Sequence, residues 1–256
     1  MEEEHLFISD VHLGTLNHKN EQLIENDLLA LIDYAINRSA KIYVLGDLFD
    51  YWMEFPNSNY LPPIGKKIVE AFERYNNEIT PALYITGNHD NWTLGHFKKC
   101  GFDVENEYRI IKIFDKKICL MHGDGIMKSN KTLKRPLLHT ILRSKAFLYF
   151  YRNLFLHKTC INLMRIFSIS TRKINRTNTI KLNTNAEFIL NSKFADIVFM
   201  GHDHIPRSET FKSGLYINLG TFFHHRSMVR GINGNFSLVH WNAHNQQFNT
   251  YKALNK

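Results

Sequence analysis

The chain has 256 residues, 44% of them hydrophobic, which suffices for one large domain or one domain with an insert. Its formal net charge is +8, and its three scattered cysteines disfavour disulfides or a zinc knuckle and fit a reducing compartment. The acidic start leads directly into an apolar run, so we expect no signal peptide, and apolar stretches of about ten residues exclude a bilayer-spanning helix.

Hydrophobic periodicity predicts alternating strands and helices in the first half of the chain and mainly strands near its end. We expect helices near residues 21–37, 63–76 and 185–193. We expect strands near residues 5–9, 41–45, 82–86, 108–114, 117–121, 196–200, 215–219, 235–240 and 247–252. A βαβαβ start followed by strands is typical of two sheets flanked by helices, so the predicted fold class is α/β.

Five of the apolar runs end in a glycine or another residue that leads directly to a carboxylate, an amide or an imidazole. Short apolar runs bounded by glycine are typical of buried strands, and α/β sheets build their sites at strand ends. This placement predicts a metal site formed by Asp10, His12, Asp47, Asn88, His122, His202 and His204.

These candidate ligands offer oxygen and nitrogen atoms but no sulfur. Seven ligands are too many for one tetrahedral zinc, whereas a shared carboxylate would let them hold two divalent ions such as Mn, Fe or Zn. Two ions about 3.5–4 Å apart clamp the attacking and leaving oxygens of a phosphoryl group and generate hydroxide at neutral pH. In the alternative interpretation each histidine only caps a strand or packs in the core, and this would have to hold at all five strand ends.

In order and spacing, the motifs D-x-H, G-D, G-N-H-D, H and G-H-x-H resemble those of the calcineurin-like metallophosphoesterases over residues 6–220. The resemblance implies a four-layer αββα sandwich with an inserted helical lid. It implies one ion held by Asp10, His12, Asp47 and His204, and a second held by Asp47, Asn88, His122 and His202. Asp47 would bridge the ions, His89 would act on the substrate phosphate as a proton donor or charge stabiliser, and Asp90 would orient His89.

A basic segment separates the strand before His122 from the strand before His202. Between Asp124 and Glu187 lie 62 residues with no Asp or Glu but with 13 Lys or Arg, while the rest of the chain has 19 basic and 24 acidic residues. The whole positive net charge therefore comes from this segment. We expect residues 126–182 to form a lid, called the insert below, and residues 1–125 and 183–256 to form the core.

The insert also contains apolar residues at helical spacing, at 137–142, 146–151 and 161–169. Helices that are apolar nearly all round must bury against something. Three interpretations remain open: a self-packed cap with solvated charges, a nucleic-acid surface, or an amphipathic lid that contacts anionic lipid and holds a phosphate-bearing lipid. A nucleic-acid surface predicts single aromatic residues interleaved with basic ones, so the mixture of basic and aliphatic helices favours the lipid interpretation.

The insert, the G-D-L-F-D-Y-W motif at residues 46–52 and the M-H-G-D motif at residues 121–124 are most similar, within this family, to UDP-2,3-diacylglucosamine hydrolases of lipid A synthesis. Well-known members have Arg at the place of His89 and Thr at the place of Asp203. The resemblance implies hydrolysis of the UDP-2,3-diacylglucosamine pyrophosphate to UMP and 2,3-diacylglucosamine 1-phosphate (lipid X). The two ions would be Mn²⁺, with Fe or Zn as alternatives.

This interpretation names the partners as a nucleotide-linked glycolipid and an anionic membrane surface, with no nucleic acid and no obligate protein partner. The enzyme would be cytoplasmic and peripheral on the inner membrane. The substrate-binding candidates are Asn88, Phe147, Phe150, Arg165, Arg172, Lys173 and Arg176. One alternative is a phosphodiesterase or nuclease of the same family, which steep salt dependence on polynucleotide would indicate. Another is a non-enzymatic scaffold on the same fold, in which missing ligands would be expected.

Overall fold

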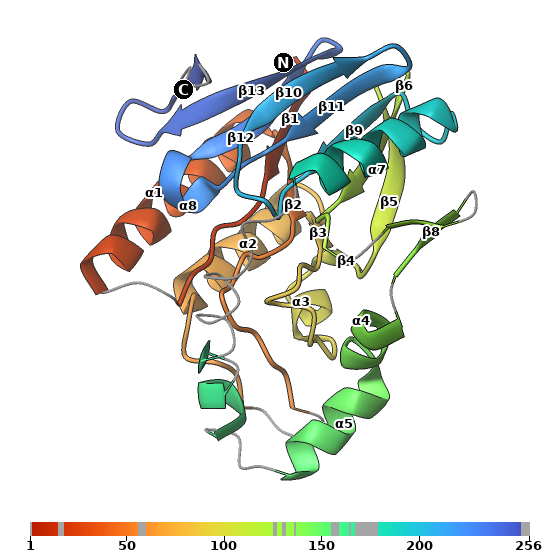
Figure 1. The fold of residues 1–256 in the computed structure, drawn as a ribbon. Coiled ribbons are helices and arrows are strands. Elements are labelled where there is room, and N and C mark those ends of the chain that lie inside the picture. The colour runs from red at the N-terminus through yellow and green to blue at the C-terminus, as the bar shows by residue number, and fades with distance from the viewer. Residues whose placement is uncertain are drawn as a thin grey trace.

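The computed structural model describes residues 2–14, 18–55, 60–124, 127–129, 132–135, 137–154, 159–163, 165–166 and 179–251. Two β-sheets pack face to face, with helices on their outer faces (Figure 1). The larger sheet has seven strands in the order β14 (Gln247–Thr250), β13 (Asn235–Asn242), β12 (Ser227–Ile232), β1 (Glu4–Ile8), β2 (Lys41–Leu45), β3 (Leu83–Ile85) and β4 (Asp103–Glu105). The smaller sheet has five, in the order β10 (Arg207–Phe211), β11 (Gly214–Asn218), β9 (Ile197–Met200), β6 (Lys116–Met121) and β5 (Tyr108–Ile113).

Helices α1 (His18–Arg38) and α2 (Lys66–Glu78) connect the parallel strands β1, β2 and β3. Side chains of a strand alternate between the two faces of a sheet, so Leu6 of β1 packs toward these helices while Phe7 packs toward the smaller sheet. Helix α7 (Thr179–Asn191) covers the outer face of the smaller sheet. The layers are therefore α, β, β and α, which confirms the predicted four-layer fold.

The strands that carry the candidate ligands lie within one residue of their predicted ends. Five strands were not predicted: β4, β10 and β12 of the core, and β7 (Met127–Ser129) and β8 (Thr132–Lys134) at the start of the insert, where only helices were expected. Strands β4 and β10 are edge strands with charged residues, and β12 carries Arg230 and Gly231 inside the sheet. Helix α7 begins six residues before the predicted helix at 185–193, so the predicted boundary of the insert at residue 182 falls inside a helix that packs on the core.

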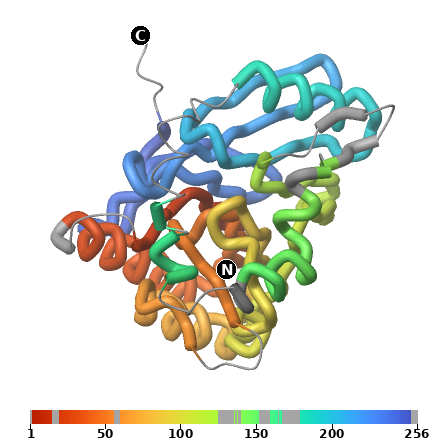
Figure 2. Tube along the Cα trace, turned by 60° about the horizontal axis from the view of Figure 1, so that its bottom comes forward, coloured from red at the N-terminus to blue at the C-terminus, as the bar shows by residue number. Residues whose placement is uncertain are grey.

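The described part of the insert comprises a hairpin of β7 (Met127–Ser129) and β8 (Thr132–Lys134), helices α4 (Leu137–Leu142) and α5 (Lys145–Leu154), and helical residues at 159–163 and 165–166. Both views place α4 and α5 beside the segment around α3 (His96–Lys99) (Figures 1 and 2). Leu148, Cys160 and Ile161 are buried in the same apolar cluster as Phe55 of the core. Among the described residues, no helix is long and apolar enough to cross a membrane.

Candidate metal centre

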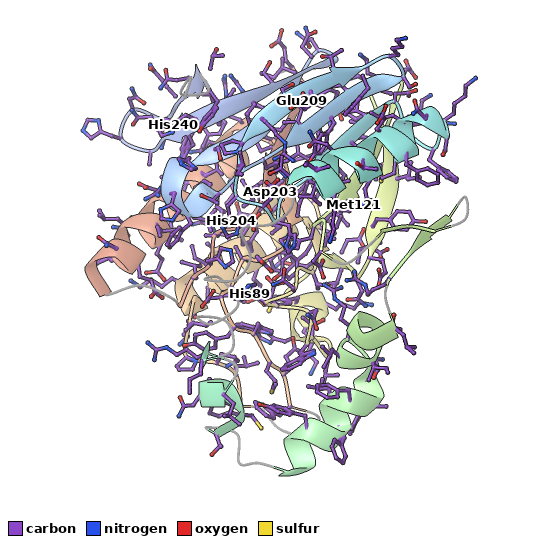
Figure 3. All side chains as sticks on the ribbon, viewed as in Figure 1. His89, Met121, Asp203, His204, Glu209 and His240 are labelled. Carbon is purple, nitrogen blue, oxygen red and sulfur yellow. The ribbon has the colours of Figure 1, made fainter. Side chains whose placement is uncertain are left out.

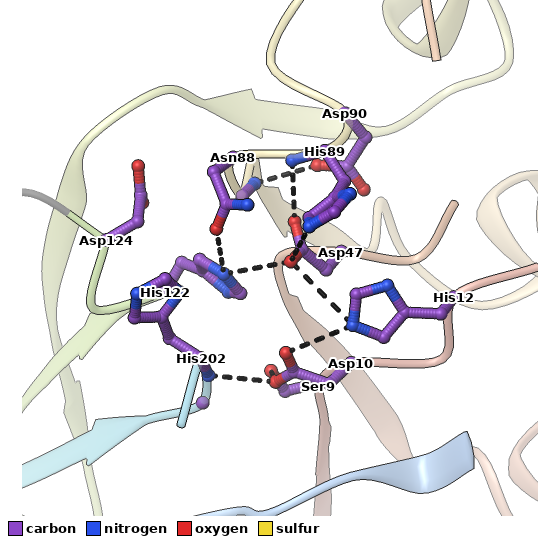
Figure 4. A network of polar contacts seen from close by, with 12 residues as sticks. Ser9, Asp10, His12, Asp47, Asn88, His89, Asp90, His122, Asp124 and His202 are labelled. Atoms are coloured by element: carbon purple, nitrogen blue, oxygen red, sulfur yellow. Dashed lines mark hydrogen bonds and ion pairs between the residues drawn. The ribbon is translucent and has the colours of Figure 1, made fainter. Parts of the chain in front are cut away.

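The predicted ligands meet where the carboxyl ends of strands from both sheets come together. Asp10, Asp47 and Asn88 follow the parallel strands β1, β2 and β3, while His122 and His202 follow the parallel strands β6 and β9. Figure 3 shows His89, Asp203 and His204 gathered in the middle of the molecule, with His240 toward its periphery. Figure 4 shows the side chains converging on one small volume.

The backbone is shaped for this convergence. Asp10, His12, Asp47, His202 and His204 all have positive φ angles, of 54°, 51°, 52°, 74° and 62°. The left-handed region costs residues other than glycine about 1–3 kcal/mol each, and such strain gathers at functional sites. Five of the seven candidate ligands therefore have a strained backbone conformation. We interpret this strain as the cost of directing their side chains into the centre.

Glycines at the strand ends make room for ligands from neighbouring loops. A Cβ atom at Gly87 would collide with the carboxylate of Asp47, and one at Gly201 would collide with Ser9 and Asp10. Any larger residue would have to displace a ligand, so these positions require glycine.

The first group of ligands consists of Asp10, His12 and His204. Nε2 of His204 lies 3.0 Å from Asp10 Oδ1 and 3.1 Å from Nε2 of His12. Asp10 Oδ1 is buried and accepts no hydrogen bond from the described residues. Burying a carboxylate oxygen without a hydrogen bond is costly, and the two imidazole nitrogens beside it complete a donor set that suits a divalent cation.

The second group consists of Asp47, Asn88, His122 and His202. Nε2 of His122 lies 3.2 Å from Asp47 Oδ2 and 3.3 Å from Asn88 Oδ1. The same Asp47 oxygen lies 3.9 Å from Nε2 of His12, so this carboxylate stands between the two groups. The rings of His122 and His202 are 5.1 Å apart. The arrangement fits two ions that share Asp47.

Hydrogen bonds to the other ring nitrogen set the tautomer of the ligating histidines. His12 Nδ1 donates to Asp50 Oδ1 at 3.2 Å, and His122 Nδ1 donates to the carbonyl oxygen of Leu45 at 2.8 Å. In both rings Nδ1 therefore carries a proton, and Nε2 is the atom that would ligate a metal ion. Asp50 was not predicted as a site residue, although its place in the G-D-L-F-D motif was a signal.

The charges in the centre are coupled. Burial raises the pKa of Asp47, but the neighbouring His122 and His89 outweigh this effect and hold the pKa well below its usual range. Burial lowers the pKa of His122, but the carboxylate of Asp47 outweighs this effect and raises the pKa to about 10. Burial lowers the pKa of His202 to about 4. A metal ion at His122 must therefore displace a proton, whereas His202 is already neutral at pH 7.

The carboxylate of Asp90 joins two ligand loops. It accepts hydrogen bonds from the amides of Leu48 and Gly87, each at 2.7 Å, and from the hydroxyl of Tyr84. The ring of His89 instead donates from Nδ1 to the carbonyl oxygen of Asp50 at 2.9 Å. Asp90 therefore positions the backbone that carries Asp47 and Asn88, and the carbonyl oxygen of Asp50 is the acceptor that orients the His89 ring.

The structure describes three of the six substrate-binding residues predicted in the insert. Phe147 is half-buried with its ring 5.9 Å from that of Trp92, whereas Phe150 is 64% exposed and Arg165 is also exposed. Three further candidates lie outside the described residues: Arg172, Lys173 and Arg176.

An oxygen- and nitrogen-rich centre with a shared carboxylate defines a class of protein, the dinuclear metal-dependent hydrolases. The model of the calcineurin-like phosphoesterase family matches residues 5–206, and the chain belongs to this family.

It is similar to proteins named UDP-2,3-diacylglucosamine hydrolase. One from Blochmanniella pennsylvanica is 29% identical over 207 residues, which cover 78% of this chain and 79% of the relative. Another, from Edwardsiella ictaluri, is 24% identical over an alignment of 261 positions that covers 93% of this chain and 92% of the relative. The protein is a metal-dependent phosphoester hydrolase.

Proposed function

We propose that this enzyme hydrolyses the pyrophosphate of UDP-2,3-diacylglucosamine to UMP and 2,3-diacylglucosamine 1-phosphate. The reaction takes place at the cytoplasmic surface of the inner membrane. The observation that carries the proposal is the docking of an apolar, basic insert directly beside the metal centre. The similarity to proteins named for this substrate supports it.

Helix α5 docks on the loop that follows the G-N-H-D motif. The ring of Trp92, two residues after Asp90, lies 5.9 Å from that of Phe147 and 5.7 Å from that of Tyr151. The indole nitrogen of Trp92 donates to the carbonyl oxygen of Leu142 at 2.8 Å. Apolar side chains of the insert therefore begin next to the residues that act on phosphate, which suits a lipid with a phosphate-bearing head.

The solvent side of the insert also suits an anionic lipid surface. Leu137, Phe150 and Ile166 are 75%, 64% and 61% exposed, and no acidic residue occurs between Asp124 and Glu187. Exposed apolar side chains among basic ones mark surfaces that contact anionic membranes. Phe147 packs on Trp92, so we assign it to docking of the insert and Phe150 to lipid contact.

The chemistry follows from the two ligand groups. Two Mn²⁺ ions, with Fe or Zn as alternatives, would be held by the two groups and share Asp47. When bound, they supply a hydroxide nucleophile and neutralise charge on the pyrophosphate. His89 holds Nε2 3.9 Å from Asp47 Oδ2, where it can hydrogen bond to a phosphoryl oxygen beside that carboxylate.

Replacing residues 145–178 by a short Gly/Ser link tests the substrate. We expect kcat/KM for the diacylated UDP-sugar to fall by roughly 10³-fold, because remote binding energy is lost, while hydrolysis of a small phosphodiester changes by less than about threefold. The deletion spares Arg135 and Arg143, since both contact the core beside the metal centre. Steady-state kinetics on both substrates measures the effect.

Circular dichroism and metal analysis of the shortened protein provide the controls. An equal loss on both substrates would mean that the insert is structural and would contradict a lipid-binding role. Unchanged lipid turnover with lost polynucleotide cleavage would support the nuclease alternative instead.

A further inference from the structure

One arginine of the insert donates a hydrogen bond to the backbone of a loop that carries a candidate metal ligand. Arg143 follows α4, and its side chain is only 10% exposed. It donates to the carbonyl oxygen of Gly87 at 2.6 Å and to that of Asn106 at 2.7 Å. It also lies 3.2 Å from the carboxylate of Asp124. The guanidinium is therefore held by acceptors of the core.

Two of these acceptors, Gly87 and Asp124, belong to loops that carry candidate ligands. Gly87 immediately precedes Asn88, and Asp124 comes two residues after His122. The ligand atoms themselves, Asn88 Oδ1 and His122 Nε2, are 3.3 Å apart. Because Arg143 holds both loops, a shift of its guanidinium would change the separation of these two atoms.

The carboxylate of Asp124 is paired with two arginines of the insert. Asp124 is 3% exposed, and it lies 2.8 Å from Arg135 and 3.2 Å from Arg143. Two guanidinium groups therefore face one buried carboxylate. Removing Arg143 would leave this buried carboxylate with one of these two guanidinium partners, and the loss of a partner from a buried charge is costly.

We propose that Arg143 is a positioning residue, which couples docking of the insert to the half of the metal centre formed by Asn88 and His122. The inference rests on the two-ion centre of the proposed function but not on its lipid substrate. A planar guanidinium can reach Gly87, Asn106 and Asp124 at once, whereas a lysine ammonium cannot reproduce this fork. The insert then completes the metal centre as well as the substrate site.

The test is a titration of the full-length, metal-free protein with Mn²⁺, followed by calorimetry. In Arg143→Met we expect one of two Mn²⁺ sites to weaken by about 10–100-fold, as for other groups that support metal ligands, and the other to keep its affinity. The kcat for a small phosphodiester should fall at low Mn²⁺ and recover at saturating Mn²⁺. Arg74→Met, which breaks an exposed ion pair with Asp33, is the matched control.

Two other variants test whether the effect depends on Arg143 itself and whether it survives a conservative change. Arg135→Met leaves the bond from Arg143 to Gly87 in place and should change Mn²⁺ affinity by less than Arg143→Met. Should Arg143→Met fail to fold, Arg143→Lys retains a charge opposite Asp124 and carries the same expectation. Two Mn²⁺ sites of normal affinity in the Arg143 variant would overturn the proposal. An increased KM for the lipid alone would make Arg143 a substrate-binding residue instead.

Discussion

Replacing Asp47 by Ala is expected to abolish phosphoester hydrolysis, with a loss of about 10⁴-fold or more in kcat, equivalent to about 5.5 kcal/mol. The carboxylate stands between both ligand groups, 3.2 Å from His122 and 3.9 Å from His12. Its other oxygen accepts a hydrogen bond from the backbone amide of His89 at 3.0 Å. The substitution therefore also removes a bond that holds the loop after β3. Without Asp47, neither ion can be held at the separation that catalysis requires.

The measurement is turnover by chelator-treated, Mn²⁺-reconstituted protein together with metal content per chain. Asp47→Asn keeps the shape of the side chain and removes its charge, so it should also lose activity. Asp33→Ala replaces an exposed acidic residue outside the centre and should behave as the unaltered protein. His12→Ala should leave one ion and reduced activity. Full activity of Asp47→Ala would refute the dinuclear site.

Replacing His89 by Ala is expected to lower kcat by about 10²–10⁴-fold, as for a general acid or a group that stabilises charge in the transition state. The ring is 8% exposed, and its Nδ1 is engaged by the carbonyl oxygen of Asp50. Only Nε2 can therefore act on a phosphoryl oxygen. Because it interacts with the substrate mainly in the transition state, KM should change less than kcat.

Single-turnover kinetics and metal analysis of His89→Ala separate its role from that of a ligand. Metal content should stay at two ions per chain, since His89 belongs to neither proposed ligand group. His244→Ala, a substitution at an exposed histidine, provides the comparison. Loss of an ion in the His89 variant would show that its assigned role is wrong.

The core of the site could be predicted because its ligands follow buried strands. The run before Asp47 is apolar on both faces of the sheet, so β2 had the predicted bounds of 41–45. Once such strands are parallel, the residues at their carboxyl ends must meet. Asp50 and Asp90 could not be given roles this way, since their roles depend on backbone groups and one ring nitrogen that only the folded chain brings near.

The insert shows the limit of reasoning from composition. A count of charges predicted solvated or lipid-facing basic residues, yet Arg143 bonds to Gly87, 56 positions earlier in the chain. Phe147 was predicted to bind substrate because it is aromatic and lies in an apolar helix, and the structure adds a contact that the sequence did not predict, with the ring of Trp92. Neither long-range partner leaves a periodic signal, whereas the strands and helices of the core do.

The most direct test of the account is ³¹P NMR of the Mn²⁺-loaded protein with UDP-2,3-diacylglucosamine in detergent, in water enriched with ¹⁸O. We predict equal amounts of UMP and the acylated sugar 1-phosphate, one ¹⁸O atom in a single product, and no reaction after chelation. Absence of UMP, while a small phosphodiester is still hydrolysed by the same sample, would contradict the proposed substrate.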